Sequence, residues 1–430
     1  MSPLGHDTNN CGARDHPCQS IVKAVHQVDC GGKIYLEGTG TKKTFYNCSV
    51  SEGHEGIYIN KSLSIKGSTS HIFCDGGIHF KKTNGSQRME FQLSGIVFWQ
   101  TPLAFDDCHS VQIVNCSFHH SPAALSIQIA SITTFQLQIQ GFSYFHENLQ
   151  CVEVLLINNS ENRNQALNIN VSDTYFSENG FDGGQRTHKG GVRIATSKKY
   201  PAKSLAVQII VSCINVSYVG NHGPFMDLFV PNGVTNERYK NVELKCNTVK
   251  KEPLYFSTVK EAHVNFLAFQ CINNSSPCIG IQSGKADVEI QSSSFDKQIV
   301  KKGRGAGLFL EAKISAFLKI FNSTFKNNKA LAGGSLFANT PRGLLTTSLT
   351  NVLFSYNGAG MFGCAVAIGV LPRKKHRRFY NQSIPNELDF TLRNVTVLNW
   401  RKLYGNKYKC TAIEVFSERR KSDTIQFQFL

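Results

Sequence analysis

The chain has little tryptophan, methionine and charge for its length, and it has no long apolar run. Its 430 residues include 2 Trp and 4 Met, and charged residues make up 18% of the total. A run of about 18 apolar residues, the length that a membrane-spanning helix needs, is absent. The sequence therefore predicts no membrane span.

Two further absences concern the cysteines and the start of the chain. No Cys-x-x-Cys pair occurs, which disfavours a zinc ribbon and a thioredoxin-like redox site. The first residues, MSPLGHDTNNCG, lack the apolar core of a secretory signal. At the other end, TIQFQFL stops within an alternating strand pattern. We therefore expect the chain to be either a piece of a longer protein or the product of a mispredicted gene model.

The residues that are plentiful indicate a secreted β protein. There are 35 Gly and 30 Phe, which favour turns and strands, and 14 Cys, an even number. Many Asn-x-Ser/Thr sequons accompany the cysteines and predict N-glycosylation in the secretory pathway. The sequons begin at Asn47, Asn60, Asn84, Asn115, Asn158, Asn170, Asn215, Asn273, Asn274, Asn322, Asn381 and Asn394.

A four-residue segment that begins with Phe and ends with Asn recurs along the chain. Clear copies are Phe145 to Asn148, Phe176 to Asn179, Phe325 to Asn328 and Phe354 to Asn357. Weaker copies begin at Phe118, Tyr218 and Phe295. Several copies are separated by 27 to 31 residues, and a period in this range is typical of a solenoid.

Each copy is flanked in the same way. An alternating strand pattern such as KADVEIQSSSF precedes the Phe, and glycines such as Gly190-Gly191 or Gly333-Gly334 precede a second apolar run. One such unit is too short to bury its own apolar face, so neighbouring units must stack. The sequence predicts an all-β protein, a right-handed parallel β-helix, over an ordinary β-sandwich, which gives no reason for a fixed order of Phe, Asn and Gly.

Stacking predicts a role for each repeated residue. The rings of Phe118, Phe145, Phe176, Phe295, Phe325 and Phe354 are expected to lie above one another inside the coils, each contributing roughly 1.5–3 kcal/mol. The Asn at the following bend can tolerate positive φ and pair with the Asn of the next coil.

The segment FKNNKALAGGSLF resembles the repeats of polymorphic outer membrane proteins, which are chlamydial autotransporter adhesins with FxxN and GGxI motifs on a β-helix. Predicted extracellular proteins of simple animals carry similar repeats. Good copies cover about residues 140–195 and 290–370, and the flanks fit the looser pectin-lyase-like pattern. The chain lacks the transporter barrel of the bacterial family, so the resemblance implies a β-helical fold and an adhesive surface without autotransport.

The first residues resemble the cap of pectin-lyase-like β-helices. In PCQSIVKAVHQV, apolar residues at helical spacing follow Ser20, which can act as an N-cap. We expect a short capping helix, tied down by Cys11, Cys18 and Cys30 with a pairing left open. The predicted division is a cap with the first coil at 1–50 and a β-helix at 51–430.

Candidate catalytic residues are few. Pectin-lyase-like hydrolases use clustered Asp with a His and an Arg-x-Lys pair, and the corresponding residues are Asp106, Asp107, His222 and the pair Arg238 and Lys240. Asp107 and His222 are 115 positions apart, whereas a two-carboxylate site needs its groups in one cleft. We interpret both Asp residues as turn residues.

A metal site can be tested in the same way. Cys108, His109, Cys116, His119 and His120 lie within a short stretch, which resembles a zinc-ligand cluster. No second close Cys pair completes a set of four ligands. A Cys108–Cys116 disulfide between adjacent strands is the simpler prediction, and no metal or other cofactor is expected.

The net charge of +16 indicates an anionic partner. The polyanion-binding candidates are in RKKHRR, and for a secreted protein the partner in reach is an acidic polysaccharide or a cell-surface glycoprotein. No helix-turn-helix or aromatic-basic platform points to nucleic acid. The sequence predicts a non-catalytic extracellular binding or adhesion surface, and the alternative is a polysaccharide hydrolase or lyase. The candidates are Arg373, Lys374, Lys375, Arg377 and Arg378.

Overall fold

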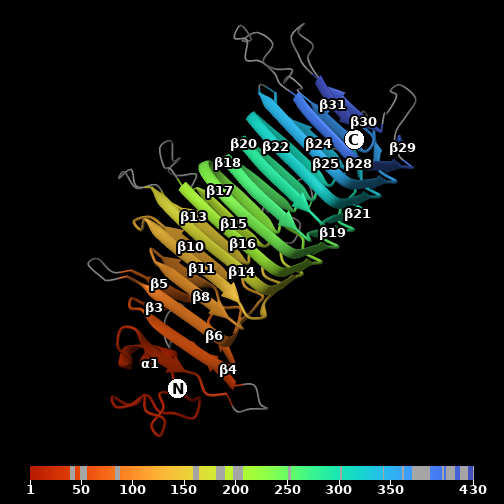
Figure 1. The fold of residues 1–430 in the computed structure, drawn as a ribbon. Coiled ribbons are helices and arrows are strands. Elements are labelled where there is room, and N and C mark those ends of the chain that lie inside the picture. Colours follow the sequence, from red (N-terminus) through yellow and green to blue (C-terminus); the bar gives the residue numbers. More distant parts are fainter. Residues whose placement is uncertain are drawn as a thin grey trace. The chain divides into compact units, whose positions relative to one another are not determined.

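The chain forms stacks of short parallel strands, drawn as neighbouring arrows in Figure 1. The computed structural model describes residues 1–38, 44–48, 56–82, 88–157, 164–180, 189–196, 207–249, 253–300, 303–341, 343–360, 363–369, 388–399, 401–402, 412–416 and 425–429. About 63% of the structure is strand, with one short helix. The predicted fold class, an all-β parallel β-helix with a short N-terminal helix, is confirmed. The residues cluster in two compact units, 1–212 and 213–430.

The single helix, α1 (Ile21–Gln27), lies in unit 1 near the N-terminus (Figure 1). Ser20 is its N-cap, and the Ser20 hydroxyl accepts a hydrogen bond from the Lys23 N–H at 3.2 Å. The helix buries the side chains of Ile21, Ala24 and Val25. A disulfide joins Cys11 to Cys18 beside it, whereas Cys30 is exposed and free.

Unit 1 is built from three parallel sheets, because each coil contributes one short strand to each sheet. The first sheet contains β1 (Gly32–Tyr35), the first half of β4 (Leu63–Phe73), the first half of β6 (Glu90–Trp99), β8 (Ser110–Val114), β11 (Thr134–Gln140) and the first half of β14 (Gln165–Ser177). The second sheet contains β2 (Thr44–Asn47), the second halves of β4, β6 and β14, β9 (Ser117–His119) and β12 (Ser143–His146). The third contains β3 (Ile57–Ile59), β5 (Ile78–Lys81), β7 (Leu103–Asp106), β10 (Leu125–Ile129), β13 (Val152–Leu156) and β15 (Val192–Thr196). β16 (Val207–Val219) contains the boundary between the units.

Unit 2 repeats this plan with longer strands that run through two or three sheets. Its long strands are β17 (Met226–Lys245), β18 (Tyr255–Leu267), β20 (Ile279–Gln291), β22 (Leu308–Lys326), β25 (Leu344–Ser355) and β28 (Leu388–Leu398). Short strands complete the coils: β19 (Gln270–Ile272), β21 (Ser294–Asp296), β24 (Leu336–Asn339), β27 (Val366–Gly369), β30 (Ile413–Phe416) and β31 (Ile425–Phe429). A small separate sheet contains β23 (Lys329–Ala330), β26 (Gly358–Ala359) and β29 (Arg401–Lys402).

Two bends per coil frame the strand that carries the repeated Phe. The first bend lies three residues before the Phe position and the second lies two residues after it, and most of their residues have φ between 48° and 57°. This left-handed region is favourable for Asn and Gly and costs other residues energy. Residues at the first bend include Asn115, Asp173, Asn215, Asn241, Ala268, Ser292, Asn322, Asn351 and Asn394. Residues at the second bend include His120, Glu147, Glu178, Gly220, Cys246, Asn273, Lys297, Asn327 and Tyr356.

The repeated aromatic rings stack inside each unit. In unit 1 the rings of Phe98, Phe118, Phe145 and Phe176 follow one another at centroid distances of 5.0, 4.8 and 4.9 Å. In unit 2 the rings of Phe295, Phe325 and Phe354 are 4.5 and 5.1 Å apart. All of these side chains are fully buried or nearly so. The register of the parallel strands places each ring on the next one, because it pairs the Phe residues directly.

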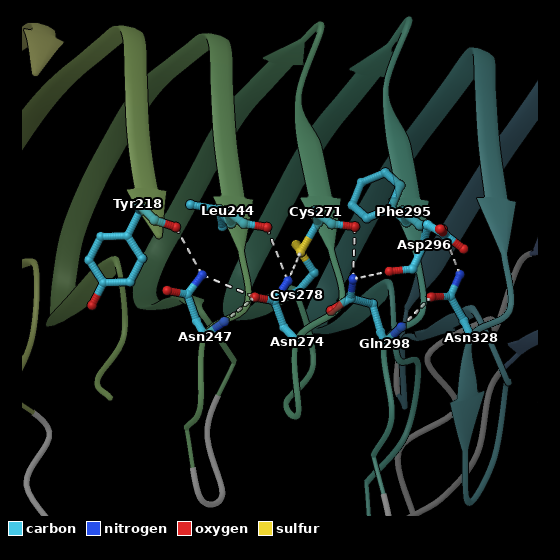
Figure 2. The surroundings of a disulfide bond; sticks show 10 residues. All are labelled: Tyr218, Leu244, Asn247, Cys271, Asn274, Cys278, Phe295, Asp296, Gln298 and Asn328. Atoms are coloured by element: carbon cyan, nitrogen blue, oxygen red, sulfur yellow. Dashed lines mark hydrogen bonds between the residues drawn. A yellow bond between two sulfur atoms is a disulfide. The ribbon is translucent and has the colours of Figure 1, made fainter. Parts of the chain in front are cut away.

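A buried carboxamide follows the Phe position and links one coil to the next. Asn328 donates from Nδ2 to the Phe295 carbonyl at 2.9 Å and accepts at Oδ1 from the Gln298 N–H at 3.1 Å. Asn247 and Asn274 also donate from Nδ2 to a carbonyl of the preceding coil and accept at Oδ1 from a backbone N–H of that coil. An amide ladder therefore runs through unit 2 (Figure 2). In unit 1, Asn148 and Asn179 form the equivalent ladder.

The glycine pair at 333–334 meets two backbone demands. Gly333 has φ of +57°, as has Gly363. A Cβ at Gly334 would collide with the carbonyl oxygen of Cys364, so only glycine fits where these backbones approach.

A polar cluster lies in the core of unit 2. The carboxyl group of Glu237 is buried and accepts hydrogen bonds at Oε2 from the hydroxyls of Tyr239 at 2.6 Å and Tyr255 at 2.8 Å. Burial raises the pKa of Glu237 although these hydrogen bonds oppose the shift. The fold therefore favours the neutral form of this side chain.

We expect Asn328→Ala to destabilise unit 2 by about 2–3 kcal/mol, because it leaves a buried N–H and a buried carbonyl without a partner. Urea unfolding at equilibrium measures the change. Lys326→Ala, at the exposed last residue of β22 just before this bend, is the control and should change the free energy of unfolding by less than about 0.5 kcal/mol. Equal effects of the two substitutions would contradict the ladder's role.

The raised pKa of Glu237 predicts a pH dependence of stability. The contribution of the Glu237 side chain to the free energy of unfolding is fully present below the ordinary pKa of Glu. It is lost as pH rises through the raised pKa of the folded state, because the charged form is disfavoured in the core. We expect Glu237→Gln to remove this part of the pH dependence, measured as urea midpoints across the acidic to neutral range. Glu289→Gln, on the outward face of β20, should keep the wild-type profile. A Glu237→Gln profile that matches wild type would contradict the assignment.

Candidate functional site

An aromatic strip lies on the outward face of the second sheet of unit 1. Successive residues of a strand point alternately inward and outward, so the register that stacks the Phe rings inside also aligns two outward rows. One row pairs Phe45, His71, Val97, Ser117, Tyr144 and Tyr175, and the other pairs Asn47, Phe73, Trp99, His119, His146 and Ser177. We define the aromatic strip as Phe45, His71, Phe73, Trp99, His119, Tyr144, His146 and Tyr175.

The rings of the aromatic strip support one another. Trp99 stacks on His119 with centroids 5.1 Å apart, and Tyr144 stacks on Tyr175 at 5.4 Å. Trp99 and Tyr175 are each 39% exposed, so ring faces remain open to solvent. Exposed rings that are already ordered by their neighbours form a binding surface whose side chains lose little entropy on contact.

The imidazole groups of the aromatic strip are close enough to affect one another. Burial and, to a smaller extent, the nearby imidazoles of His146, His120 and His71 together lower the pKa of His119 to about 4. His119 is therefore neutral at pH 7, when it can stack on Trp99 and accept or donate a hydrogen bond.

Beside the aromatic strip, the second bend brings His and Glu side chains together. Glu147 Oε2 lies 2.9 Å from His120 Nδ1 and 3.8 Å from His146 Nε2. Ligand atoms of His146, Glu147 and Glu178 all lie within 4.8 Å of one another, and in the described part of the chain no other group of this kind occurs. These residues could hold a metal ion.

The predicted catalytic residues are not assembled into one site in unit 1. Asp107 has φ of 52° and its carboxylate accepts from the N–H groups of Ala130 and Ser131, so it is the turn residue that the sequence indicated. Asp106 lies at the end of β7, where burial raises the pKa of its carboxyl group and the neighbouring Lys81 and His79 side chains partly offset this. His222 belongs to unit 2, where Arg238 and Lys240 lie on β17.

The predicted Cys108–Cys116 disulfide is wrong. Both thiols are buried and free, and their Sγ atoms contact the carbonyls of Phe80 and Val114, respectively. The five-residue strand β8 separates them, and a strand rises about 3.3 Å per residue, so they lie at opposite ends of it. For the same reason these thiols do not join His119 and His120 in a metal site. His109 instead accepts the Met89 N–H at Nδ1, at 3.2 Å.

The bends explain why several sequons exist. Asn115, Asn215, Asn322 and Asn394 occupy the first bend, where the left-handed backbone favours Asn regardless of glycosylation. All four are exposed, as are Asn47, Asn60 and Asn273, whereas Asn170 is half-buried. Asn274 is buried in the amide ladder and unavailable to a glycan. Asn84, Asn158 and Asn381 lie outside the described residues.

The basic cluster that the sequence singled out, Arg373, Lys374, Lys375, Arg377 and Arg378, also lies outside the described residues. Within the described part, Arg304 places its guanidinium over the ring of Phe337 at 5.0 Å. The polyanion site stays a prediction.

The aromatic strip was not predicted from the sequence, although one signal for it, an aromatic residue beside a buried Phe, was present. Trp is scarce, and Trp99 follows Phe98 in a segment whose alternation places one of the two rings inside and the other outside. The segments FHH and YFH repeat this arrangement at Phe118 and Phe145. Reading the neighbours of each Phe would have identified the outward rows.

Comparisons with known proteins add little to this geometry. No family model matches the chain, and no curated protein matches it. Among solved structures, the chain is similar to the periplasmic alginate epimerase AlgG, with 9% sequence identity, a TM-score of 0.29, and coverage of 90% of this chain and 83% of that one. Within the described residues, no helix is long and apolar enough to cross a membrane.

Proposed function

We propose that this chain is a non-catalytic, extracellular β-helical binding protein whose aromatic strip contacts an acidic glycan, either a polysaccharide or the glycans of a cell-surface glycoprotein. The observation that carries the proposal is the alignment of exposed, mutually stacked rings across successive coils of unit 1. An extended row of rings suits an extended ligand, and contiguous exposed apolar surface commonly marks a binding site.

Three further observations support the ligand class and the location. The net charge of +16 attracts anions. Disulfides join Cys11 to Cys18 and Cys48 to Cys74, and a third joins Cys271 to Cys278 (Figure 2); such bonds are common in oxidising compartments. The FxxN and Gly-Gly repeats resemble those of adhesins and of extracellular proteins of simple animals.

We expect Trp99→Ala and Tyr175→Ala each to weaken glycan binding about tenfold, because each removes an exposed ring of the aromatic strip. Affinity electrophoresis in gels containing heparin, polygalacturonate or neutral dextran measures the retardation.

Phe317→Ala is the matched control, because Phe317 is 41% exposed but lies on β22 in unit 2. It should bind like wild type. Equal retardation of the wild type and both strip variants would contradict the proposal, as would stronger retardation by dextran than by either acidic polymer.

The alternative function is a carbohydrate-active enzyme, and Asp106 favours it. Its carboxyl group has a raised pKa and lies beside Lys81 and His79, and Tyr58 stacks on His79 at 4.9 Å. An acid near a cation on a β-helix face is a combination that hydrolysis or elimination of a uronate polymer can use.

The alternative predicts that polygalacturonate incubated with wild-type protein releases reducing ends or unsaturated products absorbing in the ultraviolet. In that case Asp106→Asn abolishes turnover, whereas Asp287→Asn, at an exposed carboxylate of unit 2, leaves it unchanged. We expect no turnover from the wild type or from either variant, because Asp107 is held as a turn residue and supplies no second acid.

A further inference from the structure

We propose that unit 1 binds a divalent transition metal, Zn²⁺ by preference, through His146, Glu147 and Glu178, with His120 as an additional imidazole ligand. The proposal is independent of the glycan proposal, because it concerns the metal alone.

The repeat of the fold brings these residues together. His120, Glu147 and Glu178 occupy the second bend in successive coils, two residues after Phe118, Phe145 and Phe176. The backbone confirms this alignment, since the His120 N–H donates to the His146 carbonyl and the Glu147 N–H donates to the Ser177 carbonyl. Adjacent parallel strands are about 4.8 Å apart, so equivalent side chains project side by side.

The types of residue at this bend are unusual for its backbone. In unit 2 the same bend carries Gly220, Asn273 and Asn327, which suit positive φ, as well as others that do not. In unit 1 it carries Gln100 and then, in the next three coils, one His and two Glu, which have metal-binding side chains; φ of these four residues is between 48° and 55°. Residues held in such a conformation often serve a function.

The distances are close to those of a first coordination shell. Glu147 Oε2 is 2.9 Å from His120 Nδ1 and 3.8 Å from His146 Nε2. Ligand atoms about 2.0–2.2 Å from a tetrahedral Zn²⁺ are separated by about 3.3–3.6 Å, so small side-chain rotations place a metal between them. Glu178 has a ligand atom within 4.8 Å of those of His146 and Glu147.

A second set of contacts orients His146. Its Nδ1 lies 2.9 Å from Ser177 Oγ, and the Tyr144 hydroxyl lies 2.9 Å from the same oxygen. Ser177 Oγ can accept from both groups, which leaves the Nε2 lone pair directed at Glu147 and available to a metal. Metal-binding histidines commonly have their other ring nitrogen fixed by such an outer hydrogen bond.

The chemistry of the ligands selects the metal. Two imidazole nitrogens with carboxylate oxygens suit Zn²⁺ and related transition metals. Ca²⁺ requires six to eight oxygen ligands and is a poor match. The ligands are partly exposed, with side-chain exposures of 35% for His120 and 40% for Glu147, so an ion can enter from solvent.

Isothermal titration of the full chain with ZnCl₂ tests the proposal. We expect one saturable site on wild-type protein, no binding of CaCl₂, and at least a tenfold loss of Zn²⁺ affinity in His146→Ala and in Glu147→Gln. Glu147→Gln keeps the size of the side chain, so an unchanged circular dichroism spectrum separates loss of a ligand from loss of the fold. Ser177→Ala should weaken binding by about tenfold, because it releases the orientation of His146.

His263→Ala is the matched control, because His263 and Asp287 form an exposed His–carboxylate pair in unit 2 at 3.8 Å, and among the described residues they belong to no group of three possible ligands. It should bind Zn²⁺ like wild type. Titration with CoCl₂ gives a second readout, since tetrahedral coordination produces visible absorption that the two ligand variants should lack. Absence of Zn²⁺ binding by wild type, or wild-type affinity in folded His146→Ala and Glu147→Gln, would overturn the assignment.

Discussion

The structure depends on how the backbone is satisfied at the bend after each repeated Phe. A parallel strand that turns there leaves an N–H and a carbonyl that no neighbouring strand can pair, and leaving both unpaired inside the fold would cost several kcal/mol. One carboxamide offers a donor and an acceptor at the right separation, as Asn148 does in unit 1 and Asn328 does in unit 2. Because the bend is fixed in this way, successive coils keep the same register and the rings of neighbouring Phe residues meet face to face.

The same register also aligns the residues that face outward, outside the core. Alternation along a strand that buries Phe118 and Phe145 turns His119 and His146 outward and into line. A small ordered surface therefore arises because one local pattern is repeated in successive coils. This arrangement suits recognition of long, repetitive ligands, since neighbouring coils offer similar groups at regular spacing.

The fold could be predicted from the sequence because its main signals are local. Phe325 and Asn328 mark one bend, and Gly333 and Gly334 mark one corner of the coil. The structure has both features where the sequence predicted them. The ladder members Asn247 and Asn274 escaped notice because Leu244 and Cys271 replace the Phe before them. Cys108, Cys116, His119 and His120 stood out in the sequence because they are close along the chain, whereas a solenoid brings together residues about one coil apart. His120 and Glu147, 27 positions apart, are in contact, but Cys108 and Cys116 are not.

The buried, unpaired thiols have a consequence for biogenesis. Cys108, Cys116, Cys151 and Cys213 lie in the interior, where burial raises the pKa of each thiol and keeps it unreactive. In the nascent chain they are as open to oxidation as the cysteines that form native bridges. In an oxidising compartment, folding of each coil therefore has to bury its thiol before that thiol forms a non-native disulfide.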